Sequence, residues 1–242
     1  MTSKRHALVT GANKGIGLAI ARGLAKAGLS VWIGARDRSR GEEAVKQLQA
    51  EGLDVRFLEI DVADEDSVRR AAETVASETG ILHVLVNNAG IILDRKRPPS
   101  EARMEDIKAT FEVNLYGPIR VTQAFLPLIK AGEDGRIVNM GSGVGSLALI
   151  LDPTSIYSSV NFLDYTTLKV ALSAVTVAFA KELEPLGIKV NVVEPGNVQT
   201  DLNDNEGMLT PEEGAATAIR MALIDKDGPT GGFFGSHGRQ PW

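Results

Sequence analysis

The sequence of 242 residues contains no cysteine and only three histidines. The absence of cysteine excludes disulfide bonds, thiolate metal sites and a cysteine nucleophile. His6, His83 and His237 lie far apart in the sequence, so the chain favours neither a histidine-rich metal site nor a Ser-His-Asp triad. We therefore expect no bound metal.

The chain also lacks an excess of positive charge and a long hydrophobic run. It has 26 Lys and Arg against 31 Asp and Glu, a formal net charge of −5, which gives a nucleic-acid backbone no electrostatic reason to bind. No apolar run approaches the roughly 18 residues of a membrane span, and the short one near the N-terminus is too brief for the core of a signal peptide. We expect a cytoplasmic protein with neither nucleic acid nor membrane as a partner.

The remaining composition is that of an ordinary globular protein. Hydrophobic residues make up 43% of the chain and charged residues 24%. A chain of this length buries a full core, and α/β folds of this size routinely form one unit. No internal repeat, low-complexity tract or linker divides the sequence, so we expect a single domain over residues 1–242.

Short apolar runs alternate with longer segments in which apolar residues recur every three or four positions. The short runs predict strands at 6–10, 30–35, 54–60, 83–88, 135–141 and 188–193. The longer segments predict helices at 15–27, 40–50, 67–78, 104–129, 165–184 and 211–223. Strands that are apolar throughout and separated by helices form parallel sheets covered on both faces. The predicted fold class is α/β, with one doubly wound parallel sheet and helices on both faces.

Two irregular segments, 143–164 and 201–210, directly follow predicted strands. In an open α/β sheet, ligands bind beyond the carboxyl ends of the strands. The two segments are therefore candidates for loops that face a substrate. Several of their residues would make such a pocket mostly hydrophobic, although packing explains each of them equally well: Leu147, Leu149, Ile150, Phe162 and Met208.

The first predicted strand leads into the sequence TGANKGIG, which places Gly11, Gly15 and Gly17 ahead of the first helix. Glycine lets the backbone approach a ligand closely, and a helix N-terminus offers free N–H groups and a positive dipole end to a phosphate. This pattern favours a nucleotide site. The spacing is G-x-x-x-G-x-G rather than G-x-G-x-x-G, and a glycine-rich turn without a ligand is the alternative.

The end of the second predicted strand bears on the type of dinucleotide. An acid there holds a free ribose 2′-hydroxyl, whereas an arginine accommodates a 2′-phosphate. Arg36 is the first charged residue after the strand, and Lys14 adds a second cation from the glycine loop, which favours NADP(H). Asp37 favours NAD instead if the strand ends one residue later, and a solvated surface charge is the commoner role of any single Arg or Lys.

Tyr165 has a lysine one helical turn later, Lys169, in the sequence YTTLK. Residues four positions apart share a face of a helix. A nearby ammonium favours the ionised phenol and lowers its pKa from about 10 toward neutrality, where the phenol serves as acid or base. The pair is a candidate catalytic unit. A half-buried tyrosine beside an unrelated solvated lysine is the alternative.

Four motifs resemble those of the short-chain dehydrogenase/reductase family, in the proper order and at near-standard separations. They are TGANKGIG at 10–17, NNAG at 87–90, YTTLK at 165–169 and EPGNVQT at 194–200. The resemblance covers nearly the whole chain and implies a Rossmann sheet of about seven strands. The segment that begins ARDRSRG is most similar to the NADPH-dependent carbonyl reductases.

The resemblance implies a catalytic tetrad. Ser142 would bind the substrate carbonyl, and Tyr165 would deliver the proton. Lys169 would bind the nicotinamide ribose and lower the pKa of the phenol, and Asn114 would anchor the water that links Lys169 to solvent. A turn residue is the alternative for Ser142, and a structural amide in a kinked helix is the alternative for Asn114.

The resemblance also implies which residues contact the cofactor. They are Gly11, Asn13, Lys14, Gly15, Ile16, Gly17, Arg36, Asp61, Val62, Asn88, Ala89, Gly90, Tyr165, Lys169, Pro195, Gly196, Val198 and Thr200. Of these, Asp61 and Val62 would contact the adenine, residues 88–90 would line the ribose, and Val198 with Thr200 would hold the carboxamide.

Together these features predict an enzyme that transfers hydride between NADPH and a ketone or aldehyde, with reduction as the physiological direction. The expected partner is a small-molecule carbonyl substrate. A carrier-bound 3-oxoacyl group is a second possible substrate, although this acidic chain shows no basic docking patch. An NADP-binding regulator without turnover is a third reading, which the intact tetrad disfavours.

Ser142 and Tyr165 lie 23 positions apart, which is more than is usual in the family. The extra residues include the apolar stretch 147–151 and a turn-forming Asp152-Pro153 pair. One reading packs this insertion on the outside of the helix that carries Tyr165, where relatives associate. The other keeps it over the cofactor cleft and leaves the helix free.

The first reading predicts a monomer or at most a homodimer rather than a tetramer. The insertion would then cover an apolar stripe of Leu172, Val175 and Phe179 that the helix otherwise exposes. Sedimentation at micromolar concentration measures the assembly. A species near four times 25.8 kDa would refute this role for the insertion.

Overall fold

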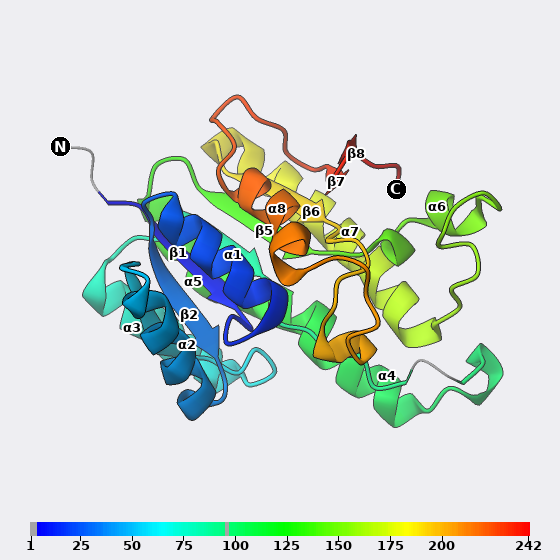
Figure 1. The fold of residues 1–242 in the computed structure, drawn as a ribbon. Helices are drawn as coiled ribbons and strands as arrows, with labels where there is room; N and C mark the ends of the chain where they lie inside the picture. The colour runs from blue at the N-terminus through cyan, green and yellow to red at the C-terminus, as the bar shows by residue number, and fades with distance from the viewer. Residues whose placement is uncertain (1–3, 95–96) are drawn as a thin grey trace.

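The computed structural model describes residues 4–94 and 97–242, and its centre is one eight-stranded sheet (Figure 1). The strand order is β3-β2-β1-β4-β5-β6-β7-β8. The strands are β1 His6–Thr10, β2 Ser30–Ala35, β3 Val55–Glu59, β4 Val84–Asn87, β5 Arg136–Met140, β6 Lys189–Val193, β7 Phe233–Gly235 and β8 Gly238–Arg239. Strands β1 to β7 pair in parallel, and β8 pairs antiparallel with β7. The predicted doubly wound parallel sheet is confirmed, with a short antiparallel edge strand added.

Helices cover both faces of this sheet. They are α1 Gly15–Lys26, α2 Arg38–Ala50, α3 Glu65–Glu78, α4 Met104–Phe111, α5 Gly117–Ala131, α6 Leu147–Leu151, α7 Leu163–Leu183 and α8 Pro211–Ala222. Shorter helical turns are η1 Pro99–Glu101, η2 Glu112–Tyr116, η3 Gly143–Gly145, η4 Glu184–Leu186 and η5 Asp201–Asn203. Helices α1, α2 and α8 share the core on one face, and α3, α5 and α7 share the core on the other.

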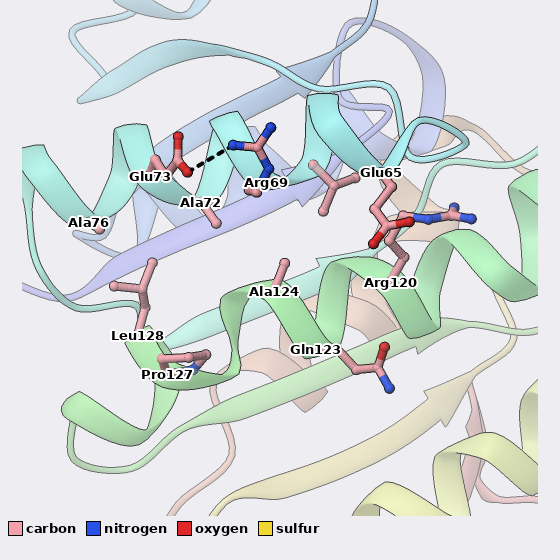
Figure 2. A pocket seen from close by; sticks show the side chains of 11 residues that line it. Glu65, Arg69, Ala72, Glu73, Ala76, Arg120, Gln123, Ala124, Pro127 and Leu128 are labelled. Carbon is pink, nitrogen blue, oxygen red and sulfur yellow. Dashed lines mark hydrogen bonds and ion pairs between the residues drawn. The ribbon is translucent and has the colours of Figure 1, made fainter.

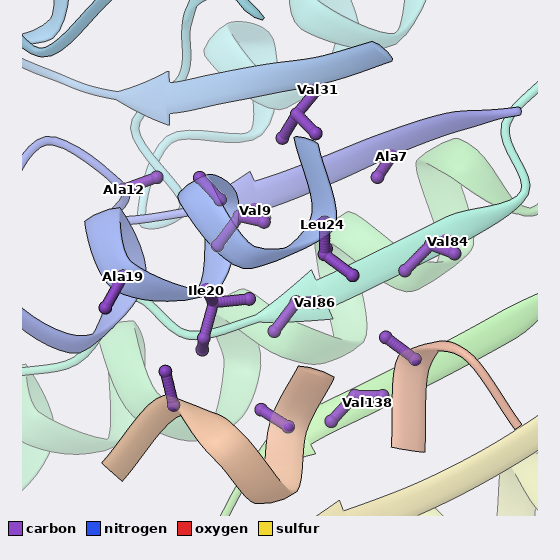
Figure 3. Close-up of a cluster of buried hydrophobic side chains, with 14 of the residues drawn as sticks. Ala7, Val9, Ala12, Ala19, Ile20, Leu24, Val31, Val84, Val86 and Val138 are labelled. Carbon is purple, nitrogen blue, oxygen red and sulfur yellow. The ribbon is translucent and has the colours of Figure 1, made fainter. Parts of the chain in front are cut away.

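The alternation of side chains along β1 shows how one strand serves both cores. Ala7 and Val9 face α1, where they meet Ile20 and Leu24 (Figure 3), while Leu8 belongs to the core on the opposite face. All of these residues are fully buried. Burying a side chain the size of Leu24 contributes about 1.5–3 kcal/mol, so the two cores hold β1 firmly in the middle of the sheet.

One predicted helix is interrupted in the structure. The segment 104–129 was expected as a single helix, but α4 and α5 are separated by η2, a π-helical turn. Within that turn, the side-chain amide of Asn114 donates to the Ile91 carbonyl at 2.7 Å and accepts from the Ile91 N–H at 2.8 Å. Apolar periodicity does not register one wide turn whose stabilising partner lies far away in the sequence.

A chain of buried polar side chains crosses one core layer. The Asn87 amide on β4 donates to the Thr122 hydroxyl on α5 at 3.1 Å and to the Asn139 oxygen on β5 at 2.8 Å. The Asn139 amide in turn donates to the Thr176 hydroxyl on α7 at 2.9 Å. All four residues are buried, so these bonds replace contacts with water and fix α5 and α7 to the centre of the sheet.

With the following η4 turn, α7 is long and apolar enough to meet the length and composition of a membrane span, contrary to the expectation that no run approaches that length. Its residues Leu168, Leu172 and Leu183 are buried inside the protein. One such helix is weak evidence for a membrane, since the core helix of a globular domain has the same composition. The absence of a membrane partner stays a prediction.

The insertion before Tyr165 contacts the C-terminal end of the chain. Its α6 is linked to the C-terminal residue, since the Ala148 N–H donates to the Trp242 carbonyl at 3.1 Å. On α7, Leu172 is buried within the protein, while Val175 and Phe179 are half-buried, so the expected exposed stripe is largely covered without the insertion. The structure therefore gives no support to the insertion as the cover of that stripe, and the assembly state stays a prediction.

The buried polar chain makes Asn139 a critical residue for stability. Asn139→Ala removes the acceptor for Asn87 and the donor to Thr176, and leaving buried polar groups unpaired costs about 1–3 kcal/mol. We expect the free energy of unfolding, measured by urea denaturation, to fall by that amount. Gln47→Ala on the exposed face of α2 is the control and should change it by less than about 0.5 kcal/mol. A loss at Asn139 as small as that of the control would contradict this role.

Candidate active site

The glycine loop between β1 and α1 is shaped to receive an anionic group. Gly11 and Gly15 have φ angles of +64° and +54°, a conformation that favours glycine. A Cβ on Gly17 would lie 2.4 Å from both the Asn88 amide nitrogen and the Gly11 carbonyl oxygen, so no side chain fits there. The first helical bond runs from the Leu18 N–H to the Lys14 carbonyl at 3.2 Å. The N–H groups before it lack partners inside the helix, which suits a phosphate.

Hydrogen bonds between the ends of β1 and β4 hold this loop in place. The Thr10 hydroxyl accepts from the N–H groups of Asn88 and Ala89 at 3.0 and 3.1 Å. The Asn88 side chain donates to the carbonyls of Thr10 and Gly11 at 2.9 and 3.2 Å. The segment 88–90 thus lies beside the glycine loop, as expected from the NNAG motif.

The end of β2 removes the ambiguity between Arg36 and Asp37. The strand ends at Ala35, so Arg36 is the first residue beyond it; its side chain is exposed and has no hydrogen bond or ion pair with any described residue. Asp37 is the N-cap of α2 and accepts from the Arg40 N–H at 3.0 Å. The carboxylate is therefore occupied by the helix, and the free guanidinium fits a 2′-phosphate.

Lys14 has a different partner from the one the sequence suggested. Its ammonium forms an ion pair with Asp201 in η5, and this contact lowers the pKa of Asp201. Thr200, the neighbour of Asp201, caps the same turn together with Asn203 and lies 3.8 Å from the position of a Cβ on Gly15. The glycine loop and the segment 201–210 therefore face each other.

Ser142, Tyr165 and Lys169 come together where β5 ends. Ser142 is the N-cap of η3, and its hydroxyl lies close enough to Tyr165 to favour the ionised phenol. The Lys169 ammonium donates to the Met140 carbonyl at 2.5 Å and lies 5.3 Å from the centre of the Tyr165 ring. The two residues share one face of α7, as their spacing predicted.

The electrostatics of this group differ from the expectation. Burial raises the pKa of Tyr165 to about 12, and the nearby Ser142 hydroxyl only partly opposes this shift. Burial also lowers the pKa of Lys169 to about 8. The expectation that Lys169 brings the phenol toward neutrality is wrong here, because loss of hydration dominates the pKa of Tyr165, and the influence that opposes it comes from Ser142. Tyr165 is protonated at neutral pH, which is the form that a proton donor needs.

Asn114, the fourth predicted catalytic residue, is buried within the π-helical turn, and both atoms of its amide are bonded to the Ile91 backbone. A Cβ on Gly90 would lie 3.5 Å from the Asn114 oxygen. The amide therefore links η2 to the segment after β4. This arrangement matches the structural alternative for the side chain; the predicted role in anchoring a water stays a prediction.

Most of the remaining predicted cofactor contacts lie in turns at the carboxyl ends of β3 and β6, and two lie at the glycine loop. Asp61 accepts from the Ala63 N–H at 3.0 Å, and the Val62 carbonyl accepts from Arg120 at 2.6 Å. Pro195 follows β6, and Gly196 has a φ of +79°. Val198 forms an isolated bridge with Leu209. Asn13 and Ile16 lie in the glycine loop and at the start of α1.

One contact was not anticipated from the sequence. Tyr157, in the insertion, donates its phenol proton to a carboxylate oxygen of Glu194 at 3.1 Å. The two positions are 37 apart, and although Glu194 opens the EPGNVQT motif, nothing in that motif points to Tyr157. The sequence indicated only that the insertion contains apolar residues, which must pack somewhere on the rest of the protein.

A groove of about 510 Å³ lies away from these residues, between α3 and α5 (Figure 2). Ala72, Ala76, Ala124 and Leu128 form part of its apolar lining. No residue predicted for catalysis or cofactor binding lines it. The groove is thus separate from the candidate active site.

Comparison with known proteins agrees with this geometry. The family model described as "short chain dehydrogenase" matches residues 5–208. The chain belongs to the short-chain dehydrogenase/reductase family. It is 35% identical over 284 residues to (+)-neomenthol dehydrogenase of Arabidopsis thaliana, which covers 95% of each chain. It is also 35% identical over 282 residues to "Carbonyl reductase [NADPH] 1" of Rattus norvegicus, which covers 100% of each chain.

Solved structures of other short-chain dehydrogenases/reductases share the whole fold. The NADPH-bound carbonyl reductase from chicken fatty liver superposes with a TM-score of 0.86 at 25% identity, covering 99% of each chain. Salutaridine reductase from Papaver somniferum gives a TM-score of 0.82 at 28% identity, covering 96% of this chain and 100% of that one. The resemblance read from the four sequence motifs is confirmed.

Proposed function

We propose that this protein is an NADPH-dependent reductase that converts a ketone or aldehyde to an alcohol. The observation that carries the proposal is the group of Ser142, Tyr165 and Lys169 at the end of β5, within the same edge of the sheet as the glycine loop. Relatives named carbonyl reductase [NADPH] 1 and (+)-neomenthol dehydrogenase support a small-molecule carbonyl or alcohol as the partner.

The residues present fit NADP(H). The N-terminus of α1 would receive the pyrophosphate, with Gly11, Gly15 and Gly17 allowing close approach. Arg36, which is exposed and has no partner among the described residues, would receive the 2′-phosphate. When bound, NADPH supplies the hydride. The segments 88–90 and 195–200 would flank the ribose and the carboxamide, and Asp61 with Val62 would adjoin the adenine.

The protein's own part in the reaction is to hold the carbonyl and to supply a proton. The hydroxyl of Ser142 and the phenol of Tyr165 would both donate to the carbonyl oxygen. Tyr165 is protonated at neutral pH, which is the form that a proton donor in carbonyl reduction requires. The Lys169 ammonium, held by the Met140 carbonyl, lies close enough to stabilise the phenolate left behind.

We further propose a cytoplasmic enzyme that is a monomer or homodimer. The nearly complete burial of Leu172 supports this assembly state, because α7 then presents a narrower apolar surface than its sequence suggests. Neither nucleic acid nor a membrane is expected as a partner, and the acidic charge of the chain supports the first of these expectations.

NADPH oxidation followed at 340 nm with a panel of cyclic and aromatic ketones and aldehydes tests the proposed reaction. We expect consumption of NADPH with at least one apolar carbonyl compound. If the protein reduced only carrier-bound 3-oxoacyl groups, these would replace small ketones and aldehydes as the proposed substrate class. Tight NADPH binding, seen by fluorescence, with no consumption across the panel would contradict an enzymatic function.

Tyr165→Phe tests the proton donor. The substitution removes the phenol oxygen but keeps the ring, so we expect kcat to fall by about 10²- to 10⁴-fold with NADPH binding largely retained. Tyr116→Phe is the matched control, because that side chain is exposed, and its rate should stay close to that of the unmodified protein. Activity of Tyr165→Phe within tenfold of the unmodified protein would rule out this assignment.

Arg36→Ala tests the choice of cofactor. Loss of a charge-assisted contact to the 2′-phosphate should lower kcat/KM for NADPH by about tenfold to a hundredfold and leave NADH almost unaffected. Arg38→Ala is the control, since Arg38 is already paired with Glu42 and Glu59. Equal kcat/KM for NADPH and NADH in the unmodified protein would show that Arg36 does not select the cofactor.

A further inference from the structure

The insertion between Ser142 and α7 has few attachments to the rest of the protein. Residues 151–162 are all exposed or half-buried. Asp152 and Ser155 make hydrogen bonds only within local turns. Among the described residues, two hydrogen bonds link this insertion to distant segments: Ala148 to the Trp242 carbonyl, and Tyr157 to Glu194. The second lies beside the candidate active site.

Tyr157 and Glu194 together cover the residue that follows Ser142. A Cβ placed on Gly143 would lie 2.1 Å from the ζ-carbon of the Tyr157 ring and 2.6 Å from the Glu194 Oε2. Such distances leave no room for a side chain. The phenol ring and the carboxylate therefore pack directly on the backbone of η3.

The opposite side of η3 packs on the helix that carries the catalytic pair. A Cβ on Gly145 would lie 3.0 Å from the carbonyl oxygen of Lys169 and 3.1 Å from its carbonyl carbon. Val144, between the two glycines, is buried, and its N–H donates to the Ser142 hydroxyl at 3.4 Å. The turn thus lies between the Tyr157–Glu194 pair on one side and α7 on the other.

The surroundings of Glu194 make its hydrogen bond effective. Glu194 follows β6, and its N–H donates to the Phe234 carbonyl at 2.9 Å, which fixes its backbone to the sheet. Burial raises the pKa of Glu194, and burial together with the Glu194 charge raises that of Tyr157. Both side chains are half-buried, where a hydrogen bond to a carboxylate is stronger than at the fully exposed surface and costly to break.

We propose that Tyr157 and Glu194 are positioning residues for this reaction, whose hydrogen bond presses η3 against α7 and so sets the Ser142 hydroxyl beside the Tyr165 phenol. Neither residue contacts the reacting atoms; both act through Ser142. The effect on turnover rests on the proposed reductase function, whereas the effect on the order of η3 does not. The two consequences are therefore measured separately.

Four variants separate the hydrogen bond from packing. Tyr157→Phe keeps the ring on Gly143 and removes only the hydroxyl, and Glu194→Ala removes the acceptor. Glu194→Gln keeps an oxygen that accepts from the phenol, so it should restore the contact. Asp152→Ala is the control within the insertion, because among the described residues the Asp152 side chain bonds only to Thr154, two positions later. Thermal unfolding verifies that each variant is folded.

The first measurement is hydrogen exchange at the amides of residues 144–146, which are bonded within the turn to Ser142 and Gly143. We expect exchange to be about tenfold faster in Tyr157→Phe and Glu194→Ala, the effect of losing about one hydrogen bond. Glu194→Gln and Asp152→Ala should match the unmodified protein. Unchanged exchange in Tyr157→Phe and Glu194→Ala would overturn the proposal.

The second measurement is the steady-state reduction of a carbonyl found active in the panel. Tyr157→Phe should lower kcat by about five- to thirtyfold, with KM for NADPH within about twofold, because the cofactor site is not disturbed. Faster exchange with unchanged kcat would refute the positioning role. If the unmodified protein consumed no NADPH, the proposed function would fail, and the exchange comparison would still decide whether the pair orders η3.

Discussion

The position of α7 depends on the buried hydrogen bonds that run from Asn87 through Asn139 to Thr176. Thr176 lies about two helical turns beyond Lys169 on the same helix, so whatever fixes one fixes the other. A helix held only by apolar contacts could slide by fractions of an ångström at little cost. Directional bonds in the core prevent this, and the Tyr165–Lys169 pair therefore takes its precision from contacts that never meet a ligand.

The features that the sequence predicted well depend on local patterns. Fully buried parallel strands appear as continuous apolar runs, and β1 and β2 occur at the predicted residues. The glycine loop was predictable because positive φ angles at Gly11 and Gly15 leave little choice of residue. The Tyr165–Lys169 pair was found because a four-residue spacing places both on one helical face.

The features that it missed depend on partners distant in the sequence. The π-helical turn is stabilised by Asn114 and the backbone of Ile91, and no periodicity reveals that pairing. The ion pair of Lys14 with Asp201 joins segments that only the fold brings together. The prediction that the pKa of Tyr165 is lowered was wrong for a related reason. The pKa is raised by burial, and the degree of burial of a side chain is a property of the folded structure.

The loose attachment of the insertion has a consequence for how this protein diverges from its relatives. Residues 151–154 are exposed and make mainly local contacts, so mutations there leave the folded core almost untouched. Such a segment accumulates changes at little cost in stability while its neighbour η3 stays constrained between two packed surfaces. A loop that tolerates mutations, next to a turn that does not, is a favourable starting point for changing substrate specificity, both in evolution and in protein engineering.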